Sequence, residues 1–394
     1  MTQLPKAIIL LFGFALAAGA QSLEDLNIQI HGYVTQAMVG TTANNWNTME
    51  TSSVSAAWTE AVVNVTSQPM PKLRVGAQGR YYQLGNYGNT VTLDWASGDY
   101  KVNERFGIRV GKVKTPMGLL NESQDIDPAF LWSLLPQAVY PIASRNSTLA
   151  HFGGVVYGTQ RLGGRGGKLD YRAWGGELVL GSNDGYLQRY IDRGFTLPNG
   201  LSGQTYGAAL RWNAPLQGLM VGASESHAEF SGAIQAPMPL GPGGSYIVVT
   251  GNANMPGRFF PYYFGRYEHG KTMVAAEYTR LNVAGTLTFP VAGVFPQRAN
   301  AKAFYGMASY KLSGKLTAGA YYCYSLDHQQ TQPAPGRFLR DYTVSGRYDF
   351  SSFIYAKAEQ HITSGTLVGY SSLDNPNGLK TDTKMTIVKV GVSF

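Results

Sequence analysis

Apolar and polar residues alternate along most of this chain of 394 residues. In one segment Phe106, Ile108 and Val110 alternate with glycines and with Arg105 and Arg109. A period of two is typical of a β-strand whose two faces meet different environments. The pattern, bounded by turn residues, predicts sixteen strands, at 26–39, 52–66, 73–84, 89–100, 105–115, 151–162, 168–180, 203–214, 219–230, 258–268, 271–282, 301–312, 315–326, 337–350, 353–364 and 383–394.

The connections between these strands alternate in length. Short ones, such as 269–270 and 313–314, take turns with long ones, such as 116–150 and 231–257, and only 85–88 is short where a long one is expected. Such sorting indicates an antiparallel up-and-down β-barrel with short turns at one end and longer loops at the other. An even number of strands lets the first close on the last. Pro261 interrupts one predicted strand, and without that hairpin the number would be fourteen.

The arginines identify the inner face of the predicted barrel, because a mid-strand arginine facing lipid costs about 2–4 kcal/mol. A sixteen-stranded barrel is too wide for its own side chains to fill, so the arginine face should line a water-filled channel. We predict a transmembrane all-β fold with a single barrel domain at 21–394 and no plug domain. The lumen wall should include Arg74, Arg80, Arg172, Arg211 and Lys389.

Counting every charge on this face gives ten cations and seven anions, which predicts a mild preference for anions. The cations are Arg74, Arg80, Arg105, Arg109, Lys168, Arg172, Arg211, Arg347, Lys357 and Lys389, and the anions are Glu60, Asp94, Asp170, Glu277, Asp341, Asp349 and Glu359.

Both ends of the sequence indicate export. Residues 1–20 contain Lys6, a short apolar run and a small-residue cleavage site, Ala18-Gly19-Ala20, which predicts a signal peptide. The last strand places four apolar residues on one face, Val388, Val390, Val392 and Phe394. A terminal Phe behind such alternation resembles the C-terminal signal of bacterial outer-membrane barrels. That resemblance implies that the barrel-assembly machinery reads these four residues.

Composition supports a membrane barrel and excludes other classes. The chain has 48 Gly and 25 Tyr, only 14% of its residues are charged, and it lacks an apolar run of 18 residues, so a helical membrane protein is not expected. The formal charge of +8 falls to +7 when Lys6 leaves with the signal peptide. The positive charges are spread singly, without the basic and aromatic clusters of nucleic-acid-binding proteins. Cys323 is the only cysteine, so no internal disulfide and no thiolate metal site is expected.

The connection at 116–150 is long enough to predict a functional loop. It begins with an acidic stretch containing Glu122, Asp125 and Asp127, and an apolar stretch at 129–135 predicts a short helix. Its apolar side chains should fold back against the barrel wall or against a neighbouring subunit; they are Phe130, Leu131, Trp132, Leu134, Leu135, Val139 and Tyr140.

Three segments around this loop, 109–119, 121–122 and 134–141, resemble the phosphate-selective porin O and P group of Gram-negative bacteria. The resemblance is specific over about residues 105–160 and implies a homotrimer in the outer membrane, with a loop folded into the channel. It also implies a pore constriction built from wall cations, loop acids and a cation on the returning limb, which are Arg105, Arg109, Lys112, Lys114, Glu122, Asp125, Asp127 and Arg145. The acidic loop departs from what a strong phosphate binder needs.

The function expected from these features is passive diffusion of small hydrophilic solutes with a mild preference for anions. Two alternatives stay open: a specific channel for phosphate or organic anions, and a barrel that displays adhesin or receptor loops. Catalysis is not expected, because His151, His227 and His361 are isolated in the sequence. Asp125 and Asp127 could form an acid/base pair or a Ca²⁺ site, but further oxygen ligands do not follow at the spacing of a Ca²⁺ loop. We therefore expect no cofactor and no metal.

Overall fold

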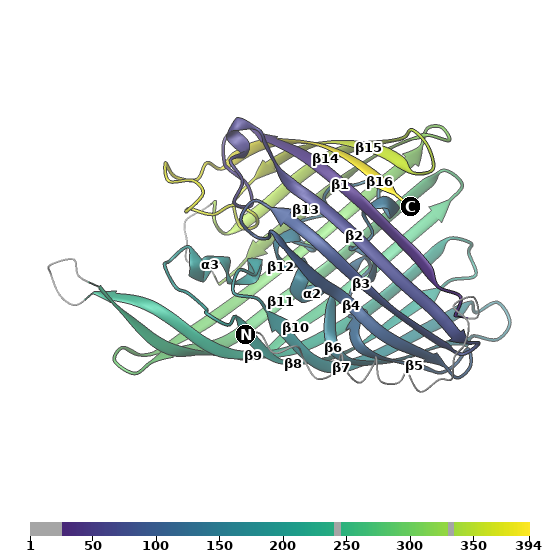
Figure 1. The fold of residues 1–394 in the computed structure, drawn as a ribbon, viewed down its shortest axis with the longest axis horizontal. Coiled ribbons are helices and arrows are strands. Elements are labelled where there is room, and N and C mark those ends of the chain that lie inside the picture. Colours follow the sequence, from purple (N-terminus) through teal and green to yellow (C-terminus); the bar gives the residue numbers. More distant parts are fainter. Residues whose placement is uncertain (1–25, 240–245, 330–334) are drawn as a thin grey trace.

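The computed structural model describes residues 26–239, 246–329 and 335–394, with only the backbone described at 258 and 259. Sixteen antiparallel strands form a closed barrel in which each strand pairs with its neighbours in chain order (Figure 1). The first strand pairs with the last over Tyr33 to Thr41 and Met385 to Ser393, so the predicted closure is confirmed. The predicted signal peptide at 1–20 lies outside the described residues.

The strands are β1 Gln29–Thr41, β2 Ser55–Met70, β3 Leu73–Leu84, β4 Thr90–Lys101, β5 Gly107–Lys114, β6 Ala150–Arg161, β7 Lys168–Leu180, β8 Leu201–Asn213, β9 Leu219–Pro239, β10 Tyr246–His269, β11 Thr272–Phe289, β12 Gly293–Lys311, β13 Leu316–Asp327, β14 Phe338–Asp349, β15 Ile354–Ser364 and β16 Asp382–Ser393. Short helices lie in the connections: η1 Thr51–Ser53, η2 Asn121–Ser123, η3 Asp127–Ala129, η4 Ile142–Ser144, α2 Arg145–Thr148, η5 Gly185–Leu187 and α3 Gln188–Ile191. Across the described ranges, no helix has the length and apolar character that a membrane span requires.

The predicted alternation of connections is present, with one correction. The segments predicted as long loops at 231–257 and 283–300 are mostly strand, because β9 continues to Pro239, β10 begins at Tyr246, and only residues 290–292 separate β11 from β12. These two hairpins project beyond the rest of the wall (Figure 1). We call this end of the barrel the loop end. The opposite end, where β1 begins and β16 ends, is called the turn end.

The projecting hairpins are stabilised by a tertiary partner that local sequence does not reveal. Their inner faces bury Phe230, Ile234 and Phe289 against Leu187 and Tyr190 of the connection between β7 and β8. Burying large apolar side chains contributes roughly 1.5–3 kcal/mol each. This packing extends the four strands past the point where the barrel alone would end.

Pro261 is accommodated inside β10, so the fourteen-stranded alternative is wrong. The residue pairs with Glu225 of β9, whereas the pairing with β11 passes from Phe259 to Tyr262. A proline has no N–H to donate, and the locally interrupted ladder on one side removes the need for one.

The two faces of the wall differ as the sequence predicts. On β16, Val388, Val390 and Val392 are 45–48% exposed on the outside, while Lys389 between them is 1% exposed and faces inward. Phe394 extends this strand by exchanging two backbone hydrogen bonds of 3.0 Å with Gly32 of β1. A side chain at Gly32 would collide with the Phe394 ring, so the glycine makes room for the terminal aromatic residue.

Candidate functional site

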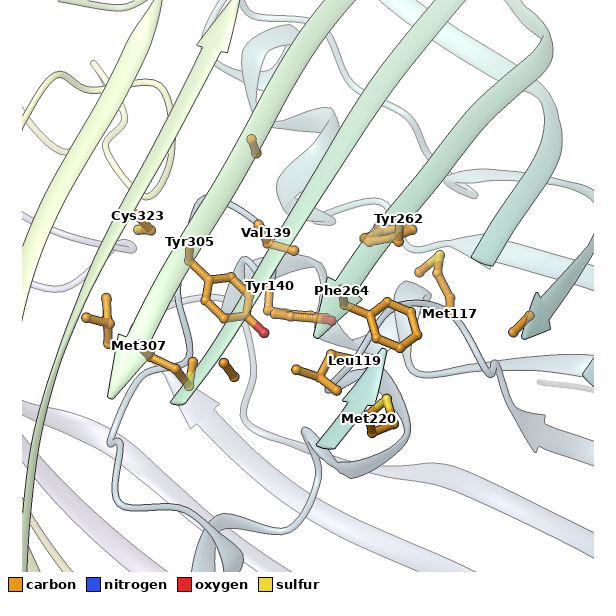
Figure 2. Close-up of a cluster of buried hydrophobic side chains, with 14 of the residues drawn as sticks. Met117, Leu119, Val139, Tyr140, Met220, Tyr262, Phe264, Tyr305, Met307 and Cys323 are labelled. Carbon is orange, nitrogen blue, oxygen red and sulfur yellow. The ribbon is translucent and has the colours of Figure 1, made fainter. Parts of the chain in front are cut away.

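The connection between β5 and β6, residues 115–149, folds into the lumen and crosses it. Met117, Leu119, Val139 and Tyr140 of this loop pack against wall residues of β9 to β13, which include Met220, Phe264, Tyr305, Met307 and Cys323 (Figure 2). The apolar loop residues therefore fold back against the barrel wall, as the sequence predicts. We call this segment the lumen loop.

The short helix predicted at 129–135 is wrong, because wall side chains take the backbone hydrogen bonds that a helix would use. Glu359 accepts from the backbone N–H groups of Ser133 and Leu134 at 2.9 and 3.1 Å. Lys357 donates to the carbonyl oxygen of Trp132, and Lys389 donates to that of Ser133, both at 3.1 Å. The segment is irregular since its polar groups are satisfied by the barrel instead.

Glu122 of the lumen loop faces two wall cations. Its Oε2 lies 3.3 Å from Nη1 of Arg172 on β7 and 3.2 Å from Nη2 of Arg211 on β8. The three side chains are 16–26% exposed, so the cluster is partly accessible to water. Arg211 also donates to the carbonyl oxygen of Gly118 at 3.0 Å, which holds the start of the loop. Two guanidinium groups against one carboxylate leave a local excess of positive charge.

Asp127 also faces two cations, but this cluster is buried. Its two carboxylate oxygens each lie 2.9 Å from an ammonium group, one of Lys357 on β15 and one of Lys389 on β16. Tyr355 donates to the same carboxylate at 2.8 Å. Burial alone would raise the pKa of Asp127, but the two ammonium groups outweigh burial and hold that pKa well below its usual range. Asp127 is therefore a charged anchor of the lumen loop.

The remaining loop charges form two neutral pairs. Asp125 lies 2.7 Å from Nζ of Lys114 and accepts from Gln78 at 2.9 Å. Arg145, on the returning limb, forms a bidentate pair with Asp94 of β4 at 2.9 and 3.0 Å. These contacts tie the loop to β3, β4 and β5 and leave no net charge.

Other residues predicted at the constriction lie elsewhere. Arg105 is exposed in the β4–β5 turn, at the opposite end of β5 from the lumen loop. Arg109 faces the lumen but pairs with Asp99 at 2.9 Å, between the turn and the loop. Lys112 points outward, where its ammonium donates to the carbonyl oxygen of Leu93 and lies 5.4 Å from the ring of Phe152. Arg109 and Lys112 are close in the sequence but lie on opposite faces of β5, so they do not meet at one constriction.

The structure places the predicted lumen-wall residues on the inner face, in different settings. Arg80 is 2% exposed and pairs with Glu60 of β2 at 2.5 Å, and Arg74 is exposed near the turn end. Arg172, Arg211 and Lys389 contact the lumen loop as described above.

Two clusters of lumen-facing acids have buried partners that the sequence pattern does not predict. His361 is not isolated: its ring lies between Asp341 and Glu359, with both N–O distances at 2.9 Å. Glu359 in turn holds the lumen loop. Elsewhere, Glu277 accepts hydrogen bonds from Tyr140 and from the backbone N–H of Leu119 at 2.7 and 2.9 Å. The alternation of the strands predicts that these acids face the lumen, but it does not predict which loop residues they contact.

A cavity of about 790 Å³ lies on the loop-end side of the lumen loop. It is bounded by residues 137–144 of that loop, by α3, and by the projecting parts of β9 to β12. Tyr190 of α3 donates a hydrogen bond to Gln297 of β12 at 3.2 Å. The guanidinium carbon of Arg189 lies 4.9 Å from the centre of the Tyr190 ring. The cavity forms a vestibule whose floor is the lumen loop.

Neither a protein-family model nor a curated protein sequence matches this chain. Solved structures do share its fold. OmpF of Salmonella typhi, in complex with daunomycin, is 15% identical, covers 95% of this chain and 100% of its own, and has a TM-score of 0.56. OmpT, an outer-membrane protein of Vibrio cholerae, is 12% identical with 93% and 97% covered and a TM-score of 0.55. An anion-selective porin from Comamonas acidovorans is 10% identical with 93% and 99% covered and a TM-score of 0.54.

These similarities show a porin-like barrel fold and do not distinguish the phosphate-selective O and P group from other porins. The apolar outer face, the closed sheet and the neighbouring folds agree on the bacterial outer membrane as the location of the chain.

Proposed function

We propose that this protein is a diffusion porin for small hydrophilic solutes, with a mild preference for anions. The observation that carries the proposal is the charge balance along the lumen loop. Glu122 and Asp127 each face two wall cations, whereas Asp125 and Arg145 sit in neutral pairs. The loop folds into the channel, and the excess of positive charge lies beside Glu122, whereas Glu277 and Glu359 add negative charge where they hold other parts of the loop.

Only one of the two positive clusters is placed to act on solutes. Lys357 is fully buried beneath the loop, while Arg172 and Arg211 keep part of their surface in water. Charges are screened over about 10 Å at 0.1 M salt, so an excess at a narrow passage acts on every ion that crosses. We assign the anion preference to Arg172 and Arg211, and leave a smaller contribution to Arg109, whose charge is compensated by Asp99.

A liposome-swelling assay tests the diffusion function. Proteoliposomes with this chain should admit small sugars and amino acids at rates that fall with solute size, and small anionic solutes faster than cationic ones of equal size. Proteoliposomes that swell no faster than empty ones would support the adhesin or receptor alternative instead. Catalytic activity forms no part of the proposal.

A specific channel for organic anions is the second candidate. It is favoured by the vestibule, whose lining includes Tyr87, Tyr186 and Tyr190 together with Arg189. A specific channel should show a small conductance that its own solute blocks at micromolar to millimolar concentrations, whereas a diffusion porin should show a large conductance without such block. Phosphate, dicarboxylates and aromatic carboxylates are the solutes to compare.

We also propose a homotrimer, supported by the outer face of β3 to β6. Small residues gather there, namely Ala77 and Gly79 on β3, Ala96 and Gly98 on β4, and Gly154 on β6. Small residues at these positions let another subunit approach the wall closely between the larger outward side chains Ile108, Val110 and Phe152. Lys112, which faces outward at the edge of this surface, would be covered by a neighbour instead of meeting lipid. Light scattering of the detergent-solubilised protein should give three chains, and a single chain would contradict the trimer.

A further inference from the structure

Two cations face each other on the outside of the barrel. Arg280 of β11 lies directly opposite Lys302 of β12 in the strand register. Their neighbours Glu277, Thr279, Ala303 and Tyr305 are buried toward the lumen at alternate positions, which puts Arg280 and Lys302 on the outer face. Like charges in directly opposed positions of a sheet are destabilising unless something compensates them.

The pair belongs to a larger basic surface. Arg298 on β12 and Arg340 on β14 are exposed on the same outer face, and Arg280 donates to Asn300 at 3.1 Å. Among the described residues, no ion pair includes any of the four basic side chains, and the outer face of β11 to β14 around them has no acid. We call Arg280, Arg298, Lys302 and Arg340 the outer basic cluster.

An aromatic row fixes the height of this cluster relative to the membrane. Tyr278, Phe304 and Tyr342 each stand two residues toward the turn end from Arg280, Lys302 and Arg340, on the same faces of the same strands. Tyr324 continues the row on β13, where its ring lies 5.6 Å from that of Phe304. Outward aromatic residues of a barrel mark the membrane–water interface, so the cations that follow them lie at the level of the lipid head groups.

We propose that the outer basic cluster binds the phosphate groups of a phosphorylated glycolipid in the outer leaflet. A phosphate seated between Arg280 and Lys302 supplies the missing negative charge and forms charge-assisted hydrogen bonds with both side chains. The aromatic row directly beneath offers apolar surface to the acyl chains of the same molecule. Free inorganic phosphate would gain nothing from that row, so the geometry favours a lipid. This inference depends on the membrane placement of the barrel and not on conduction through the pore.

The test compares two double variants of the full-length protein in detergent. Arg280→Gln with Lys302→Gln removes the opposed pair, and Lys271→Gln with Lys315→Gln removes two exposed cations from turns at the other end of the same strands. Bisphosphorylated lipid A is the probe, with lipid A lacking both phosphates and inorganic phosphate as comparisons. Binding is followed by native mass spectrometry, and heat-modifiable migration in electrophoresis confirms that each variant is folded.

The expected result is that the Arg280/Lys302 variant binds bisphosphorylated lipid A on the order of 30-fold more weakly than the wild type. The Lys271/Lys315 variant should match the wild type, and neither the dephosphorylated lipid nor inorganic phosphate should bind comparably. Equal affinity of a folded Arg280/Lys302 variant, equal losses in the two double variants, or equal binding of the dephosphorylated lipid would overturn the proposal.

Discussion

At the scale of single residues, the central feature is the pairing of one loop carboxylate with two wall cations. A mid-strand arginine can be predicted to face the lumen, because its side chain is costly to place in lipid. Its partner cannot be predicted in this way, because Glu122 and Arg211 are brought together by the path of the lumen loop and by the register of β8. The sequence therefore predicts which charges face the lumen, and the structure decides which of them remain uncompensated.

Arg172→Glu should move the pore toward cation preference by severalfold in the permeability ratio. The change replaces a partly accessible cation beside Glu122 with a second acid, which turns a positive cluster negative. The zero-current potential in a KCl gradient measures it. Arg74→Glu is the matched control, because Arg74 is exposed near the turn end of the lumen, away from the loop. Equal shifts in both variants would place the selectivity outside the lumen loop.

Asp127→Asn should loosen the lumen loop. The variant leaves Lys357 and Lys389 buried without their counter-charge, and breaking a buried ion pair costs about 3–5 kcal/mol. The loop should become sensitive to protease in the folded barrel. Glu104→Gln breaks the exposed pair with Arg161, which does not contact the loop and is worth about 0–1 kcal/mol, and should leave the loop resistant. Resistance of the Asp127 variant equal to that of the wild type would show that the pair does not anchor the loop.

At the scale of elements, period-two alternation identifies all sixteen strands, and boundaries agree closely for β3, β7, β13 and β15. The failures occur where a distant partner decides the structure. The strands β9 to β12 lengthen because the connection with α3 packs on their inner faces, and residues 129–135 stay irregular because β15 and β16 bind their backbone. Local pattern cannot reveal either partner.

Replacing residues 117–147 with a short Gly-Ser linker should raise the single-channel conductance severalfold. The ends of the loop lie together, since Lys114 pairs with Ala150 and Thr115 donates to Leu149 at 2.9 Å, so a short linker can join them. Anion preference should also increase, because Glu122 and Asp127 leave while their wall cations stay. Heat-modifiable migration checks folding, and a folded variant with unchanged conductance would show that the loop does not narrow the pore.

Phe394→Ala should lower the yield of barrel in the outer membrane more than its folding in detergent. The ring of Phe394 is 58% exposed and the backbone bonds to Gly32 survive the substitution, so little stability is lost. The apolar face that ends at Phe394 is what the resemblance assigns to the assembly machinery. Fractionation of cells that express the variant measures the yield, with Val344→Ala, an exposed change on β14, as control. Wild-type yield of the Phe394 variant would exclude the signal role.

At the scale of the whole molecule, the order of long and short connections is the feature that made the topology predictable. An up-and-down barrel needs turns at one end and tolerates loops at the other, so connection length carries information about which end a strand reaches. The lumen is different, because its shape depends on how one loop packs across it. Met117, Tyr140 and their partners on β9 to β13 determine that packing through contacts between segments distant in sequence.

The proposed function requires above all a water-filled pore that is narrowed by the lumen loop and carries an excess of positive charge beside Glu122. Planar-bilayer recording of the wild-type protein in a KCl gradient tests all of this in one measurement. We predict stepwise insertion of open channels with nearly ohmic conductance and a zero-current potential whose sign reports a mild preference for chloride. Bilayers that stay silent after insertion of heat-modifiable protein, or open channels that prefer potassium, would contradict the account.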